Sequence, residues 1–155
     1  MEKYFINVQA NLIKELPKRK RMFWGEDEEN VYFCLDNEST AMIGIPKQFF
    51  IIDTEKLKKK FSPCKSEKIK SIIKTESDFT PAEKIGTKFS GGTEYVVLKN
   101  SNWTTYVNSK LMKYFPKTAF FETSGELTAI RVYDSFGLYN SKTFIGIIMP
   151  CRVKE

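Results

Sequence analysis

The stretch "TFIGIIMPCR" (Thr143–Arg152) decides the predicted fold, because a very similar stretch occurs much earlier in the chain. That earlier stretch is "TAMIGIPK" (Thr40–Lys47). Both begin at threonine, continue as an apolar run, and end at a proline close to a basic residue. A short apolar run that stops at proline is typical of a buried strand that ends there. The pair therefore predicts two equivalent strands in a chain built from an internal repeat.

A second pair of matching stretches predicts one helix in each copy of the repeat. "VQANLIKELPK" (Val8–Lys18) aligns with "VNSKLMKYFPK" (Val107–Lys117). Their apolar positions recur at i, i+4, i+5 and i+8, as on one face of an α-helix, and each proline lies where the helix is expected to stop. Asn7 and Asn108 are of the residue type that caps helix N-termini.

Strand-like segments surround both predicted helices in the same order. The segments before the helices are Lys3–Asn7 in the first copy and Glu94–Lys99 with Trp103–Val107 in the second. The segments after them are Arg21–Gly25, Val31–Asp36 and Thr40–Lys47 in the first copy, and Ala119–Thr123, Ala129–Asp134 and Thr143–Arg152 in the second. The sequence therefore predicts an α+β fold of two β-α-β-β-β repeats related by a pseudo-two-fold axis.

The length of 155 residues and the 41% hydrophobic content predict a single domain with a sizeable core. Repeat one covers residues 1–53, a Lys-rich connector covers 54–84, and repeat two covers 85–155. Apolar residues recur at helical spacing in the connector, which predicts short helices there. "FTPAEK" (Phe79–Lys84) is expected to form a turn, and "SGGT" (Ser90–Thr93) a loop or hairpin turn.

The residue inventory argues against catalysis. The chain contains no histidine, which removes Ser-His and Cys-His nucleophilic pairs and histidine metal ligands. Cys34, Cys64 and Cys151 are too far apart in sequence to form a CxxC metal pair. The acidic run "EDEE" (Glu26–Glu29) lacks the ligand spacing of a calcium loop and is expected to be a solvated turn. We expect no enzyme activity, no cofactor and no metal.

The net charge of +6 is distributed unevenly. Residues 1–53 hold 7 Lys/Arg against 9 Asp/Glu, a net charge of −2, whereas 54–84 and 85–155 each hold 9 against 5, a net charge of +4. If the two predicted helices pair, their basic residues converge and could bind phosphates in a salt-sensitive way. An ordinary solvated helix face is the alternative. The candidate nucleic-acid-binding residues are Lys14, Lys18, Arg19, Lys20, Arg21, Lys110, Lys113 and Lys117.

The closing "IIMPCRV" (Ile147–Val153) resembles the Met-Pro-x-Arg-Leu end of bacterial β-type DNA sliding clamps. The whole stretch from Val107 onward looks like the last half-domain of such a clamp, and this chain has room for one clamp-like domain. The resemblance implies helices that face DNA and a groove beside the C-terminal strand that receives short peptides. It implies that Ile147, Met149 and Arg152 bind a protein partner.

Three functions remain open at this point. The first is a clamp-like, DNA-associated accessory protein encoded by a phage or mobile element. The second is a protein-interaction module, or an inhibitor that docks on a host replication or defence protein. The third is a small domain whose charge serves solubility alone. We expect a cytoplasmic monomer or small oligomer with no membrane association, because the apolar stretches are too short to span a bilayer and the N-terminus lacks the apolar core of a signal peptide.

Overall fold

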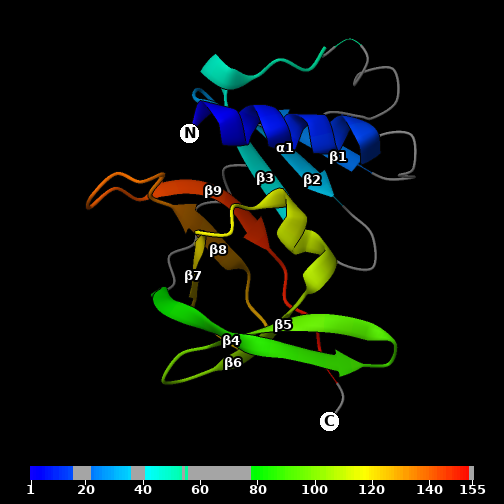
Figure 1. The fold of residues 1–155 in the computed structure, drawn as a ribbon, viewed down its shortest axis with the longest axis vertical. Helices are drawn as coiled ribbons and strands as arrows, with labels where there is room; N and C mark the ends of the chain where they lie inside the picture. The colour runs from blue at the N-terminus through cyan, green and yellow to red at the C-terminus, as the bar shows by residue number, and fades with distance from the viewer. Residues whose placement is uncertain (16–21, 36–40, 54, 56–77, 154–155) are drawn as a thin grey trace. The chain divides into compact units, whose positions relative to one another are not determined.

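The computed structural model describes residues 1–15, 22–35, 41–53, 55 and 78–153 of the chain (Figure 1). Their contacts group them into two compact units. The first unit holds the described N-terminal segments up to Glu55 except Ala41, and the second holds Ala41 and residues 78–153.

The fold is mainly β, so the predicted α+β class with two β-α-β-β-β repeats is wrong. The described residues hold nine strands, the α-helix α1 and two short 3-10 helices. In chain order the elements are α1 (Glu2–Glu15), β1 (Met22–Glu26), β2 (Asn30–Leu35), β3 (Ala41–Pro46), η1 (Lys47–Phe49), β4 (Thr80–Ser90), β5 (Thr93–Lys99), β6 (Thr104–Asn108), η2 (Ser109–Tyr114), β7 (Phe120–Thr123), β8 (Ile130–Asp134) and β9 (Thr143–Ile148).

The N-terminal helix starts earlier than predicted. The segment Lys3–Asn7, expected to be a strand, is the first part of α1. The sequence pattern placed the start of the apolar stripe at Val8, but Phe5 begins it and is fully buried. Ile13, expected on the stripe, is 47% exposed. The buried face is spaced at i, i+3, i+4 and i+7, as one side of an α-helix requires, and consists of Phe5, Val8, Gln9 and Leu12.

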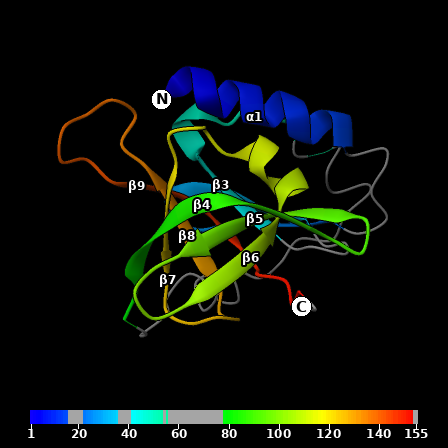
Figure 2. The same ribbon diagram turned by 60° about the horizontal axis from the view of Figure 1, so that its bottom comes forward.

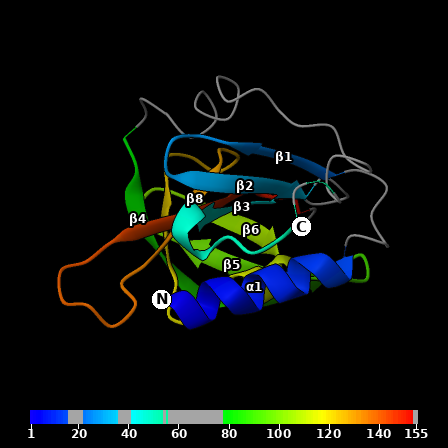
Figure 3. The same cartoon turned by 90° about the horizontal axis from the view of Figure 1, so that it is seen from above.

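The three strands of the first unit lie where the sequence predicts them (Figure 3). β1 and β2 are antiparallel, with Met22 opposite Leu35 and Glu26 opposite Val31. β3 is the neighbour of β2 in the strand order. Every residue of β3 except its terminal Pro46 is buried, so the prediction of a buried strand that stops at this proline is confirmed.

A buried glutamine joins α1 to the segment that follows β3. Gln9 is fully buried, and its Nε2 donates hydrogen bonds to the backbone oxygens of Phe5 at 2.9 Å and Phe49 at 2.7 Å. Its Oε1 accepts a hydrogen bond from the backbone N–H of Ile51 at 2.8 Å. The rings of Phe5 and Phe49 stack with centroids 5.6 Å apart. One side chain therefore satisfies three backbone groups and fixes η1 against the helix.

The second unit is a six-stranded sheet in the order β9-β8-β7-β4-β5-β6. β4 belongs to both halves, because Thr80–Ala82 pairs with β7 and Glu83–Ser90 pairs with β5, both antiparallel. The backbone N–H of Cys151, just beyond β9, donates to the oxygen of Tyr106 in β6 at 2.8 Å. This part of the sheet therefore curls until the chain after β9 meets β6 (Figure 2).

The second predicted helix, Val107–Lys117, is replaced by the last residues of β6 and the six-residue η2. Val107 lies opposite Val96 in the sheet and is fully buried, so it is committed to the strand. Asn108 caps η2 as predicted, because its side chain accepts from the N–H of Lys110. Phe115 is extended, as expected for a residue before proline. The six residues between these limits form a 3-10 helix instead of an α-helix.

The strand β4 was not predicted, and the segment Phe79–Lys84 is part of it rather than a turn. Apart from Ala82, none of its residues is buried, so its sequence lacks the apolar alternation that identifies a strand. The predicted hairpin turn at Ser90–Thr93 is confirmed, with Gly91 at φ 56° and Gly92 at φ 82°. Residues 54 and 56–77, the main part of the predicted helical connector, lie outside the described residues.

Candidate binding groove

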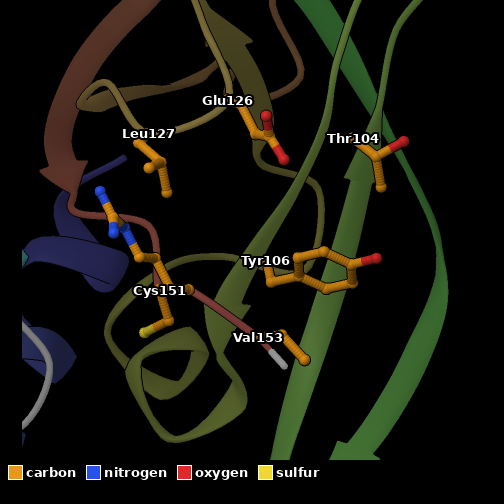
Figure 4. Close-up of a pocket in the computed structure, with 7 residues that line it drawn as sticks. Thr104, Tyr106, Glu126, Leu127, Cys151 and Val153 are labelled. Atoms are coloured by element: carbon orange, nitrogen blue, oxygen red, sulfur yellow. The ribbon is translucent and has the colours of Figure 1, made fainter. Parts of the chain in front are cut away.

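A groove with a volume of about 580 Å³ lies where the curled sheet of the second unit comes back to β6 (Figure 4). This volume falls within the roughly 300–1,000 Å³ that is usual for ligand pockets. Three segments line it: β6, the loop between β7 and β8, and the chain beyond β9. The lining residues are Thr104, Tyr106, Glu126, Leu127, Cys151, Arg152 and Val153.

The loop that forms one wall is held by buried threonines. The hydroxyl of Thr105 in β6 donates to the backbone oxygen of Glu126 at 2.9 Å. The hydroxyl of Thr123 donates to the oxygen of Gly125 at 2.7 Å. Both threonines are at most 1% exposed. The loop is thus tied to the sheet, and a ligand would meet a wall that is already ordered.

The second wall is the chain around Cys151, whose backbone is joined to Tyr106. Burial raises the pKa of the Cys151 thiol above its ordinary value, and a hydrogen bond from the backbone N–H of Asn108 only partly opposes this. The thiol therefore stays protonated at neutral pH. A protonated thiol behaves as a small apolar group and a poor nucleophile.

The groove contains a stretch of open sheet edge. β6 ends the strand order, and its outer edge is met at Tyr106 by Cys151. Backbone groups of residues i and i+2 in a strand point to the same side, so the N–H and C=O of Thr104 also point outward. The antiparallel bridge places Val153 opposite Thr104, yet no described residue forms a hydrogen bond with the Thr104 backbone on that side. An incoming extended chain could form hydrogen bonds there.

The side chains around this edge combine apolar surface with one charge of each sign. Tyr106 and Val153 are half-buried and Leu127 is 44% exposed. Glu126 and Arg152 are exposed. In Figure 4, Tyr106 stands on β6 while Leu127 and Glu126 come from the loop. Apolar walls with a few polar groups are the usual composition of a peptide or small-ligand site.

The three residues predicted to bind a partner occupy different environments. Arg152 lines the groove. Met149 is 40% exposed but does not line it, and Ile147 is 4% exposed in β9. The sequence patterns singled out neither Tyr106 nor Leu127. Tyr106 lies between the buried Thr105 and Val107 in the strand-like segment "WTTYV". Because side chains alternate between the two faces of a strand, this pattern could have indicated that Tyr106 lies on the face opposite the core.

The predicted nucleic-acid-binding residues are only partly described. Lys18, Arg19, Lys20 and Arg21 lie outside the described residues. Lys14 is exposed in the last turn of α1, in the first unit. The expected convergence rested on two matching α-helices, and η2 is not one. The other three residues are exposed in the second unit, on η2 or just after it: Lys110, Lys113 and Lys117.

The acidic run Glu26–Glu29 forms the turn between β1 and β2. Asp27 Oδ1 accepts from the N–H groups of Glu29 at 2.9 Å and Asn30 at 2.8 Å, and Oδ2 accepts from the Tyr32 hydroxyl at 2.9 Å. Burial alone would raise the pKa of Asp27, but these donors and Lys47 hold it below its ordinary value. Within the described part of the chain, no three His, Cys, Asp or Glu side chains gather closely enough to hold a metal ion.

Within the described part of the chain, none of the helices has the length and apolar content needed to span a membrane. Comparison of the chain with protein-family models, curated proteins and solved structures gave no match. The resemblance to sliding clamps therefore stays a prediction from sequence.

Proposed function

We propose that this chain is a non-enzymatic protein-interaction module that binds an extended segment of a partner protein in the groove. The observation that carries the proposal is the unpaired backbone of Thr104 at the edge of β6, inside an ordered groove. A peptide that adds a strand to a sheet edge gains affinity from backbone hydrogen bonds and specificity from pockets for alternate side chains. Thr104 supplies the edge, and the groove walls supply the pockets.

The lining indicates what such a segment would contain. Tyr106, Leu127 and Val153 favour an apolar side chain in the groove. Glu126 and Arg152 can set the direction of the segment through one basic and one acidic contact. The resemblance to sliding clamps adds support, because it implies a peptide groove beside the C-terminal strand. An inhibitor that docks on a replication or defence protein would use the same groove.

Selection of short peptides from a random display library against the full chain tests the proposal. We expect a selected peptide to lose about tenfold or more in affinity for Leu127→Glu, because a carboxylate would replace an apolar wall of the groove. The matched control is Leu138→Glu. Leu138 is 56% exposed in the β8–β9 loop, does not line the groove, and should leave binding unchanged. Equal loss in both variants would contradict the proposal.

A second candidate, a clamp-like DNA-associated role, is favoured by the three exposed lysines on and just after η2. They lie within a stretch of eight residues, from Lys110 to Lys117, and a short basic cluster of this kind can contact successive phosphates. If they bind DNA, their joint replacement by glutamine weakens duplex binding at low salt and flattens its dependence on salt concentration, measured by fluorescence anisotropy. The charge-matched control replaces the exposed Lys3, Lys84 and Lys99. Equal binding by the two triple variants would eliminate this role for η2.

A further inference from the structure

A second surface of the second unit presents an arginine surrounded by aromatic rings. The guanidinium carbon of Arg131, in β8, lies 5.0 Å from the ring centroid of Phe144, 5.4 Å from Phe79 and 5.8 Å from Tyr133. Arg131 is half-buried. Stacking on aromatic faces fixes the orientation of a guanidinium and leaves the edge that carries its N–H donors free to bind.

Arg131 has no acidic partner in the part of the chain that the structure describes. Glu122 lies directly opposite it in the β7–β8 pair, where a cross-strand ion pair is expected. The carboxylate of Glu122 is instead bound by the ammonium of Lys142 at 2.6 Å. That ammonium also lies 4.2 Å from the ring centroid of Tyr133. Lys142 thus binds the Glu122 carboxylate, which would otherwise pair with Arg131.

The hydrogen-bond count points the same way. Among the buried side-chain nitrogens and oxygens of the described residues, Nε of Arg131 is the one without a partner. An arginine carries five N–H donors, and a buried polar group without an acceptor is rare in native proteins. The rings hold the guanidinium in place but accept no conventional hydrogen bond. Nε itself is closed to solvent, so an acceptor from outside the chain would bind the terminal amino groups of the half-buried guanidinium.

We propose that Arg131 is a recognition site for a carboxylate on an acidic segment of a partner protein. A carboxylate matches the planar fork of a guanidinium in a bidentate pair. The cluster of Arg131, Lys142 and Glu122 has a net charge of only +1, from two cations and one anion. Nucleic-acid binding needs a row of cations along successive phosphates, whereas the anionic Glu122 lies directly opposite Arg131. The charge and the fork therefore favour an acidic protein segment over a nucleic acid.

The test is a titration of the full chain with a blocked tetraglutamate peptide. The NMR signal of the Arg131 Nε–H group is the readout. We expect this signal to shift on binding. Arg131→Lys keeps the charge but loses the fork, and we expect it to bind the peptide about tenfold more weakly. Inorganic phosphate at the same ionic strength is the comparison ligand. No shift at Arg131, unchanged binding by Arg131→Lys, or tighter binding of phosphate than of peptide would overturn the proposal.

Two further variants test the part assigned to Lys142. Lys142→Gln releases Glu122 to pair with Arg131, so we expect weaker peptide binding than in the charge-matched control Lys84→Gln. Glu122→Gln combined with Lys142→Gln removes the competing acid and should restore binding to near the level of the unmodified chain. If Lys142→Gln behaves like Lys84→Gln, or if the double variant does not recover, Glu122 does not compete for Arg131 and the proposed arrangement is wrong.

Discussion

Gln9→Leu is expected to destabilise the first unit by about 1–3 kcal/mol, because it leaves two part-buried backbone groups without their hydrogen-bond partner. In the folded chain the Gln9 amide satisfies the oxygen of Phe49 and the N–H of Ile51, beside its bond to Phe5 within the helix. Leucine fits the buried position of the helix face but can neither donate nor accept. The segment after β3 would then lose its polar attachment to α1.

Chemical denaturation measures this loss, and amide exchange at Ile51 reports it locally. The matched control is Gln48→Leu. Gln48 is exposed in η1, only one residue from Phe49, and its replacement should change stability by less than about 0.5 kcal/mol. Equal stabilities of the two variants, with unchanged exchange at Ile51, would show that the buried amide does not hold η1.

Thr104→Pro is expected to weaken binding of a groove-selected peptide by about tenfold or more, which corresponds to roughly 1.4 kcal/mol. Proline removes the N–H that the edge of β6 offers to an incoming strand. Thr104 is the first residue of β6, a position where a strand tolerates proline. The pairing of β6 with β5 uses the opposite side of the strand, so the sheet should persist.

Thr104→Val separates the backbone from the side chain in this experiment. Valine keeps the N–H and a similar shape but loses the hydroxyl, so peptide affinity should stay close to that of the unmodified chain. Circular dichroism and thermal unfolding of both variants check that the sheet is intact. Equal affinities for the proline and valine variants would show that the peptide does not use the edge of β6.

The sequence predicts the positions of eight of the nine strands but not the way they assemble. Alternating or continuous apolar runs mark strands such as β3 and β9, because burial selects those residues locally. The exposed β4 carries no such pattern. The second helix was wrongly predicted because Val107–Lys117 resembles Val8–Lys18 in sequence. Val8 lies within α1, whereas Val107 is paired with Val96 in the sheet.

The residues of the candidate groove were only partly predictable, because segments far apart in the sequence form it. Arg152 was singled out because the clamp resemblance ends on it, and it lines the groove. Tyr106 and Leu127 join it through the curl of the sheet, which depends on a contact between Tyr106 and Cys151 that no local pattern indicates. Ile147 was also expected at a partner site, but its side chain is buried. The spacing of apolar residues in the sequence does not show which face of a strand packs against the core.

The most direct test of the proposed function is amide hydrogen exchange at Thr104, with and without a peptide selected against the chain. If the peptide adds a strand to β6, the Thr104 N–H gains an acceptor, and its exchange slows strongly when the peptide is bound. Unchanged exchange at Thr104, with protection appearing elsewhere in the second unit, would contradict the proposal that the open edge of β6 is the binding site.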